Sequence, residues 1–351
     1  MPRRFAVQFS RHLHKQSWWK PGSTYVLALS GGMDSMALAS LMRFEDCKLV
    51  LAHVNFKLRG ESSDGDEKFV CEQAKQWGIP IETTSFATMG YALEHGISIE
   101  MAARDLRYAW FDEVLKKHQA QGVLTAHHAN DLAETVLLNM SRGMGIYGLD
   151  GIPIKSGNFF RPLLFAGRDQ IAEYVRKERI PYRDDASNLE IDIQRNRVRH
   201  EVIPELMQIN PKAVEHIGQS AGRVQQMMNL FHEYLNILKQ EFYISDNIIN
   251  LELLKEREDA DVILFEFLRD LGVHGDAIPD ILRAKSGAQF LTDAYALWIN
   301  RGKLEICERG SQDFEKVMVE GPGCVHFLQG DTLRQLCIDS YELHSREQLA
   351  A

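Results

Sequence analysis

The chain has 351 residues, of which 45% are apolar and 25% charged, and its formal net charge is −9 at pH 7. This composition excludes a wholly disordered chain, and the length is enough for about two domains. No apolar run approaches the roughly 18 residues of a membrane span. Because the chain is acidic, any contact with nucleic acid must depend on local basic clusters.

The cysteines are few and scattered, with no CxxC pair among Cys47, Cys71, Cys307, Cys324 and Cys337. Such spacing gives no signature of a disulfide scaffold, a zinc site or an iron–sulfur site. The N-terminus lacks the apolar stretch of a secretory signal. We therefore expect a protein of the reducing cytoplasm.

The first twenty residues carry five Lys or Arg side chains and no acid. Within them, Phe5, Phe9 and Leu13 recur at four-residue spacing, which predicts a short amphipathic helix. Two interpretations stay open, a plain surface helix or a basic contact for an anionic partner.

Short aliphatic runs then alternate with helical patterns. We expect strands at 25–29, 49–54, 81–86 and 123–127, and helices at 36–41, 66–77, 97–118, 132–140 and 169–179. This alternation predicts right-handed βαβ units and an α/β fold with a doubly wound parallel sheet. The first domain is expected to cover residues 1–212, with an irregular, basic segment at 184–199 near its end.

From about Val214 the pattern becomes mainly helical. Apolar residues share one helical face at 224–238, another helix is expected at 251–271, and Asn300-Arg301-Gly302 marks a hairpin turn. Residues 213–351 are therefore expected to form a smaller, mainly helical domain with a β element.

The sharpest motif is the hexapeptide Ser30-Gly31-Gly32-Met33-Asp34-Ser35, which follows a predicted strand and opens a helix. Two glycines let the backbone turn tightly, so that its N–H groups and those of the helix start can point at an anion. Asp34 could hold Mg²⁺ against phosphate oxygens. The motif is neither GxxxxGK[ST] nor GxGxxG. The simpler alternative is that Asp34 only caps the helix.

Other polar residues fall where parallel strands end, the usual ligand site of an open α/β sheet. Ser30, His53 and His127 occupy such ends. Asp131 and Glu134, three residues apart on the next helix, share a face that suits Mg²⁺ or an ammonium group. The alternative is that the helix dipole alone favours these acids. Because neighbouring strand residues point in opposite directions, either His127 or His128 could belong to the core.

Two groups of arginines are also candidates. Glu100, Arg104 and Arg107 are spaced by four and three residues along one helix. Either Glu100 and Arg104 form only an ion pair, or an arginine contacts the phosphates or the RNA. Arg195, Arg197 and Arg199 have no acid between them, which suits either a nucleic-acid backbone or a solvated loop.

Taken in order, the motifs resemble those of the PP-loop ATP pyrophosphatases, and among these the tRNA(Ile)-lysidine synthetase family. The hexapeptide is similar to the SGGxDS motif of that superfamily. The resemblance to the lysidine enzymes covers about residues 24–211 and is carried by segments 52–60, 100–108, 126–135, 142–152, 161–164, 185–188 and 195–199.

The resemblance implies a Rossmann-like PP-loop domain that uses ATP and Mg²⁺. It implies that AMP is transferred to the wobble cytidine of a tRNA(Ile) with a CAU anticodon, and that L-lysine then displaces it to form lysidine. The resemblance assigns ATP binding to Ser30, Gly31, Gly32, Met33, Asp34, Ser35, His53 and His127. It assigns catalysis to Asp34, Asp131, Glu134 and Arg104, and Mg²⁺ binding to Asp34 and Asp131. It assigns tRNA binding to Arg195, Arg197 and Arg199. Glu134 is expected to orient or deprotonate the lysine.

Some positions depart from the family pattern. Phe56 and Lys57 replace a histidine and a glycine, and Asn130 replaces the first aspartate of a DD pair. Family members often carry a further C-terminal domain, which we cannot match here, so the chain is either a short member or a shortened one. The alternatives are a 2-thiocytidine synthetase, for which clustered cysteines are missing, an amidotransferase, for which a glutaminase is missing, and an inactive nucleotide- or RNA-binding module.

Overall fold

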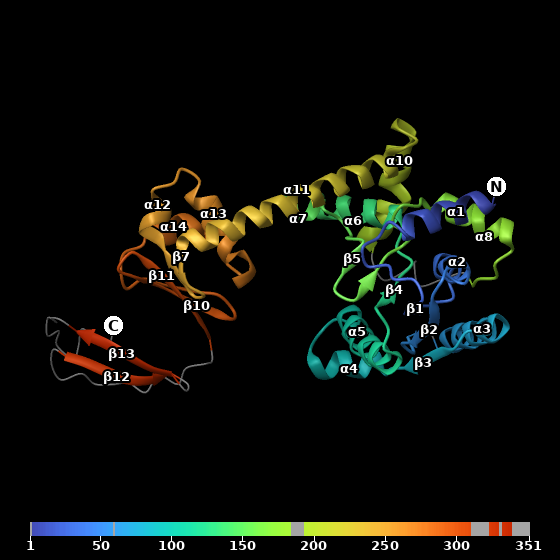
Figure 1. Cartoon of the computed structure of the whole chain (residues 1–351), viewed down its shortest axis with the longest axis horizontal. Coiled ribbons are helices and arrows are strands. Elements are labelled where there is room, and N and C mark those ends of the chain that lie inside the picture. The colour runs from blue at the N-terminus through green and yellow to red at the C-terminus, as the bar shows by residue number, and fades with distance from the viewer. Residues whose placement is uncertain (1, 59, 184–192, 310–322, 330–331, 339–351) are drawn as a thin grey trace. The chain divides into compact units, whose positions relative to one another are not determined.

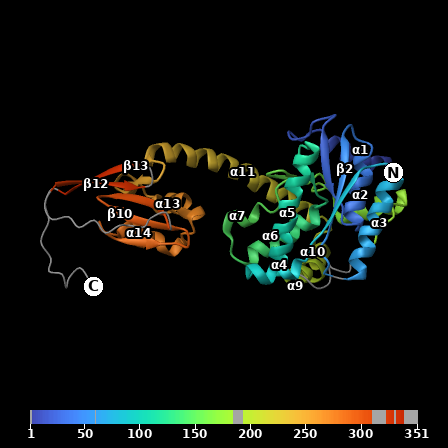
Figure 2. The same cartoon turned by 90° about the horizontal axis from the view of Figure 1, so that it is seen from below.

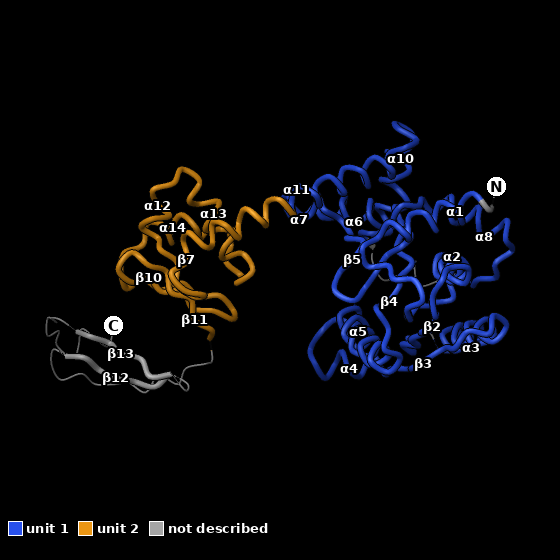
Figure 3. Tube along the Cα trace, in the orientation of Figure 1, with its two compact units in different colours: residues 1–228 blue, residues 229–351 orange. Residues whose placement is uncertain are grey.

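The computed structural model describes residues 2–58, 60–183, 193–309, 323–329 and 332–338 (Figure 1). The expected motif at 185–188 lies outside them. Two compact units, residues 1–228 and 229–351, divide the chain within helix α11 (Ala213–Phe242) (Figure 3). Each unit is described by itself. None of the described helices is long and apolar enough to cross a membrane.

A six-stranded sheet organises the first unit, in the order β3-β2-β1-β4-β6-β5. Its strands are β1 (Thr24–Ala28), β2 (Lys48–Asn55), β3 (Ile81–Ser85), β4 (Val123–Leu124), β5 (Lys155–Ser156) and β6 (Phe159–Phe160). All neighbouring strands are parallel except β5, which pairs antiparallel with β6. The expected parallel sheet is confirmed.

Helices cover both faces of this sheet, because alternate residues of a strand point to opposite sides. Tyr25 and Leu27 of β1 pack in one cluster with α1 (Pro2–Leu13), α2 (Met33–Met42) and α8 (Arg168–Glu178). Val26, between them, packs with residues of α5 (Ile99–His118) in another. Figure 2 shows α5 on one side of β2, and α2 with α3 (Glu61–Trp77) on the other. The sheet is therefore doubly wound.

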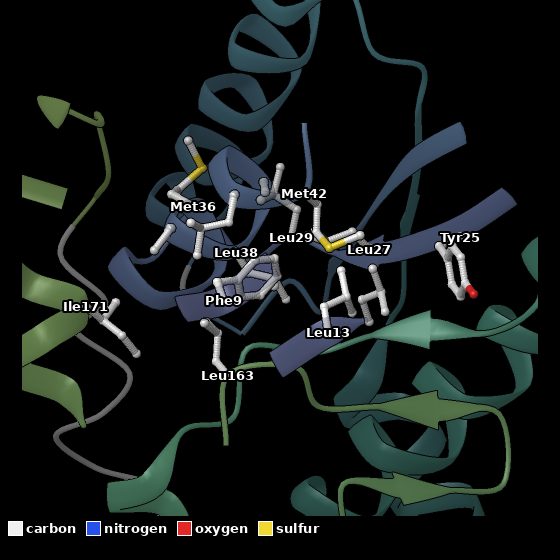
Figure 4. Packing of buried hydrophobic residues seen from close by; sticks show 14 of the residues in the cluster. Phe9, Leu13, Tyr25, Leu27, Leu29, Met36, Leu38, Met42, Leu163 and Ile171 are labelled. Atoms are coloured by element: carbon white, nitrogen blue, oxygen red, sulfur yellow. The ribbon is translucent and has the colours of Figure 1, made fainter. Parts of the chain in front are cut away.

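The N-terminal amphipathic helix is confirmed as α1. Phe5, Phe9 and Leu13 are its buried residues, and Figure 4 shows Phe9 and Leu13 among the side chains of β1 and α2. Because this face is packed inside the unit, α1 covers the core.

Two local expectations in this unit are wrong, and the first concerns the strand expected at 123–127. β4 stops at Leu124, and only the N–H of Thr125, bonded to Phe160 O at 2.9 Å, continues its pairing. The helix expected at 97–118 is confirmed as α5, which begins after Ser98 because the Ser98 hydroxyl accepts from the N–H of Met101. A helix that the sequence did not indicate, α4 (Thr88–His95), precedes it.

The second error concerns the basic segment, whose described part is helical. It consists of α9 (Ile193–Arg197), a π-helical turn (Val198–Val202) and α10 (Ile203–Ile209). The remaining helices of the unit are α6 (Ala129–Ser141) and α7 (Gly145–Leu149).

The second unit packs short helices against an antiparallel sheet ordered β7-β8-β11-β10-β9. Its strands are β7 (Tyr243–Ser245), β8 (Ile248–Asn250), β9 (Gln289–Leu291), β10 (Tyr295–Asn300) and β11 (Lys303–Glu308). A separate hairpin joins β12 (Gly323–Gln329) and β13 (Thr332–Ile338). The turn expected at 300–302 is confirmed between β10 and β11.

The single helix expected at 251–271 is wrong. Residues 251–268 hold two helices, α12 (Leu251–Lys255) and α13 (Ala260–Leu268), followed by a 3₁₀ turn (Arg269–Leu271). A further 3₁₀ turn (Gly275–Ala277) and α14 (Ile278–Arg283) follow. Leu251, Leu254, Ile263 and Leu264 all join the same core, which the interruption makes possible.

We predict that Phe9→Ala lowers the free energy of unfolding by about 3 kcal/mol, because it leaves a cavity in a packed core. Phe9 is 1% exposed. Urea denaturation followed by the fluorescence of Trp18 and Trp19, which lie in the same cluster, measures the loss. The control is Val7→Ala on the exposed side of α1, and equal stabilities for the two variants would contradict the packing described.

Candidate active site

The carboxyl ends of the parallel strands open onto one cavity of about 650 Å³ in the first unit. This is the edge of an open α/β sheet at which ligands bind, and the volume suits a nucleotide-sized molecule. The sequence-predicted residues that line it are Ser30, Gly32, Met33, Asp34, Ser35, His53, His127, Asp131 and Arg199.

The hexapeptide loop between β1 and α2 is held by its own hydrogen bonds. Ser30 Oγ lies 3.0 Å from Ser35 Oγ and accepts from the N–H of Gly32, while Ser35 Oγ donates to Gly32 O at 3.0 Å. Gly31 has φ +91°, and a Cβ there would lie 3.2 Å from Val70 Cγ1. Glycine is therefore required at this point of the loop.

The start of α2 leaves its backbone N–H groups without a side-chain cap. The N-cap residue is Gly32, and Asp34 lies in the first turn. The interpretation that Asp34 only caps the helix is therefore wrong. Uncapped N–H groups beside a cavity form an anion site, because the helix dipole adds positive potential there.

Asp34 places its carboxylate between this helix and α6. Oδ2 lies 3.6 Å from His128 Nε2, and Oδ1 is buried without a hydrogen-bond partner among the described residues. A buried carboxylate oxygen without a partner is a ready ligand for a cation. In the described ranges, no three His, Cys, Asp or Glu side chains form a metal-binding group by themselves.

His128 is the buried member of the histidine pair and begins α6. Its Nδ1 accepts from the N–H of Asp131, and Asp131 Oδ2 accepts from the N–H of His128 at 2.9 Å, a reciprocal cap. Burial lowers the pKa of His128, but the neighbouring Asp34 and Asp131 carboxylates outweigh it and raise that pKa above its usual value. For Asp131, burial is outweighed by the nearby histidines and Arg195, which hold its pKa low.

His127 faces the same cavity and differs electrostatically from its neighbour. Its Nδ1 lies 3.0 Å from Thr125 Oγ1. Burial is the main reason why its pKa falls to about 4. The ring is therefore neutral at physiological pH and is a hydrogen-bonding group without charge.

Asp131 and Glu134 do share one face of α6, and in this structure their cation partners are two arginines of the same chain. Glu134, with 0% exposure, accepts from Arg195 Nε at 2.8 Å and from Arg199 Nε at 2.6 Å. Nη2 of each arginine lies 3.3–3.4 Å from Asp131 Oδ1. We call these four side chains the carboxylate–arginine cluster.

The three basic residues expected to act together are separated by the helical geometry of their segment. Arg195 and Arg199 are four residues apart and turn to α6, whereas Arg197 points elsewhere and pairs with Glu201 at 3.3 Å. The Arg197 side chain is 70% exposed. Only Arg197 of the three is held by a surface ion pair.

The α5 arginines also take different positions. Arg107 lines the cavity, with its guanidinium carbon 5.0 Å from the centre of the Phe56 ring. Arg104 is exposed and lies over Tyr108 at 5.3 Å, and the structure does not bring it to the cavity wall. Phe56, the departure from the family's histidine, thus supplies the ring on which Arg107 lies.

Asn130, the other departure, has a structural contact. Its Oδ1 accepts from the N–H of Arg168 at 2.9 Å, at the start of α8. An amide oxygen therefore satisfies a backbone donor that a helix start leaves open.

Several cavity residues were not among the sequence candidates. Arg161 closes one wall and donates to Pro153 O, and its place in the 161–164 motif was a usable signal. Arg183 has its N–H bonded to Gly31 O and its Nε 2.6 Å from Asp66. No local pattern marks Arg183, because its position depends on contacts with distant segments.

Comparison with known proteins identifies families and relatives that this chain resembles. Residues 2–206 match the PP-loop domain family, and residues 245–309 match the TilS substrate binding domain. A tRNA(Ile)-lysidine synthase of Bacteroides thetaiotaomicron is 34% identical over 297 residues, covering 84% of this chain and 70% of the relative. One from Porphyromonas gingivalis is 36% identical over 303 residues, covering 84% and 66%. The chain spans about two thirds of the length of these relatives.

Among solved structures, the fold is similar to that of the U34-tRNA thiolase NcsA of Methanococcus maripaludis. The TM-score is 0.54 at 18% identity, covering 64% of this chain and 80% of that one. This likeness supports the PP-loop fold of the first unit.

We predict that Glu134→Gln lowers the free energy of unfolding by about 3 kcal/mol, because it removes a buried charge from between two guanidinium groups. Glu201→Gln, which changes an exposed carboxylate paired with Arg197, is the matched control and should have little effect. Chemical denaturation measures both. Equal effects would show that the carboxylate–arginine cluster does not support the fold.

We predict a second, pH-dependent effect at His127. The unfolded histidine takes up a proton near pH 6.5, whereas the folded ring does so only near pH 4, so stability is lost as the pH falls between these values. The full difference corresponds to roughly 3 kcal/mol. His127→Gln lacks this contribution, so the stability advantage of the unmodified protein should shrink as the pH falls. Parallel stability curves from pH 7 to 4.5 would refute the low pKa.

Proposed function

Because the chain belongs to the tRNA(Ile)-lysidine synthase family, we propose that it ligates L-lysine to C2 of the wobble cytidine in a tRNA(Ile) with a CAU anticodon. Family membership makes it an ATP-dependent, tRNA-modifying ligase. We place it in the cytoplasm, where tRNA and ATP meet, and assign residues 1–212 to catalysis and 213–351 to substrate binding.

One observation carries this proposal: the open helix start after the Ser30–Ser35 loop and the polar side chains of α6 face a single cavity. A phosphate group and the atoms that react with it need to be held together in this way. The loop N–H groups and the Ser30 and Ser35 hydroxyls supply donors for the phosphates. His53 and His127 are proposed to contact the rest of the nucleotide.

The carboxylates fit a divalent cation bound together with ATP. Asp34 Oδ1 has no hydrogen-bond partner in the described part of the chain, and Asp131 carries a carboxylate held in its charged form. We assign Mg²⁺ to Asp34 and Asp131, with phosphate oxygens as the remaining ligands. When bound, the ion would neutralise charge on the phosphates.

The chemistry requires two steps. The C2 oxygen of cytosine is a poor leaving group, so this oxygen first attacks the α-phosphate of ATP and pyrophosphate leaves. The neutral lysine ε-amine then attacks C2, AMP leaves with the oxygen, and the amine loses its proton. A base must be out of its stack to be reached.

We assign Glu134 a positioning role in these steps. Its oxygens accept from both Arg195 and Arg199, which leaves it poorly placed to remove a proton from lysine. Through this pairing, Glu134 keeps Arg199 at the cavity wall, where a guanidinium can stabilise negative charge on the transferred phosphate.

We propose that Arg195, Arg197 and Arg199 all contact tRNA, but in different ways. Arg197, the exposed member, is placed to meet a phosphate of the tRNA backbone. Arg104, which is exposed on α5, is proposed to contact the bound tRNA beside the site. A 2-thiocytidine synthetase gains no support, since no cysteine lies among the described residues lining the cavity.

The decisive assay is incorporation of radiolabelled lysine into unmodified tRNA(Ile) with a CAU anticodon, in the presence of ATP and Mg²⁺. We expect incorporation with this tRNA and none with a methionine tRNA of the same anticodon. Pyrophosphate release without incorporation would keep adenylation and reject lysine as the amine. Neither signal would reject the enzyme and favour a binding module.

We predict that Asp34→Asn reduces tRNA-dependent pyrophosphate release by about 100-fold, because it removes a negative charge that would hold the Mg²⁺ bound with the phosphates. Asp112→Asn, at an exposed position of α5 outside the cavity, is the control and should keep full activity. Normal release by Asp34→Asn would contradict the assignment.

A further inference from the structure

His53, at the end of β2, has one ring nitrogen bound and the other left open. The side chain is buried, with 5% exposure, and lines the cavity. Nδ1 lies 2.7 Å from Leu29 O. Since a carbonyl oxygen only accepts, Nδ1 must carry the hydrogen, and in the neutral ring Nε2 holds a lone pair.

Nε2 is buried and has no hydrogen-bond partner among the residues that the structure describes. An acceptor taken out of water without a donor costs stability, so a native protein keeps such a group for a reason. Because Leu29 O fixes the tautomer, the open nitrogen can only accept. An O–H or N–H donor of a molecule bound in the cavity would satisfy it.

The position of His53 indicates which part of ATP lies there. β2 is the parallel neighbour of β1, whose following loop is the proposed phosphate site. In the dinucleotide-binding βαβ unit, whose glycine-rich loop is of another kind, an acidic residue about 20 residues after the turn accepts from the ribose 2′-hydroxyl. His53 follows Gly31 by a similar interval. Apolar Ala52, Val54 and Phe56 line the cavity around it.

We propose that Nε2 of His53 accepts a hydrogen bond from a ribose hydroxyl of ATP and so selects a ribonucleotide. The inference deepens the proposed function, because it rests on ATP being the nucleotide bound. The remaining donor of the nucleoside, the 6-amino group of adenine, is tested as the alternative.

The test measures equilibrium binding by calorimetry for four nucleotides: ATP, 2′-deoxyATP, 3′-deoxyATP and purine riboside triphosphate, which lacks the 6-amino group. The unmodified protein should bind at least one deoxy analogue about 10-fold more weakly than ATP. His53→Asn keeps a donor for Leu29 O and removes the Nε2 acceptor. It should bind ATP about 10-fold more weakly and no longer distinguish ATP from that analogue.

The proposal is overturned if the unmodified protein binds both deoxy analogues as tightly as ATP, or if His53→Asn still distinguishes them. It is also overturned if the variant loses discrimination only against the purine riboside, since Nε2 would then read the base. The comparison of analogues on the unmodified protein does not depend on how well the variant folds.

The matched control is His12→Asn, at a half-buried histidine against Phe165 that does not line the cavity. It should leave all four affinities unchanged. Binding is measured without tRNA or lysine, so the two proposals fail separately. If the protein distinguishes ATP from a deoxy analogue but forms no lysidine, only the proposed function is rejected. If it forms lysidine but does not distinguish these nucleotides, only the role of His53 is rejected.

Discussion

The burial of Glu134 is the constraint on which the arrangement of the site depends. A carboxylate with no exposure is tolerable only if positive charge surrounds it, and here Arg195 and Arg199 supply that charge from a segment some sixty residues away. Their pairing holds α9 and the π-helical turn against α6. The same pairing sets Arg199 in the cavity wall, so a stability requirement and the shape of the site have one cause.

The parallel sheet brings the other residues of the site together. Because β1, β2, β4 and β6 end at the same edge, residues distant in the sequence meet there without any local pattern between them. Asp34 from the loop and Asp131 from α6 reach His128 from two sides. The cavity thus combines an uncapped helix start, two carboxylates and a neutral His127, and these groups are the basis of the adenylation that we propose.

Much of this could be predicted from sequence where the signal is local. Short aliphatic runs between helical patterns located β1, β2 and β3. The spacing of Phe5, Phe9 and Leu13 located α1, because the buried face of a helix recurs every three to four residues. The glycine pair marked the loop between β1 and α2 that we propose binds phosphate. The same reasoning failed where contacts between distant segments determine the local structure. The basic segment was expected to be irregular because its spacing suited a backbone contact, but pairing with α6 makes a helix that turns Arg195 and Arg199 inward.

The central claim is that this cavity transfers AMP to a base of tRNA. The most direct measurement is transfer of label from [α-³²P]ATP to unmodified tRNA(Ile) in the absence of lysine, with [γ-³²P]ATP as the parallel experiment. The account predicts that the α-label becomes attached to the tRNA and is released as AMP when lysine is added, while the γ-label leaves as pyrophosphate. ADP as the product, with no α-label on the tRNA, would contradict it.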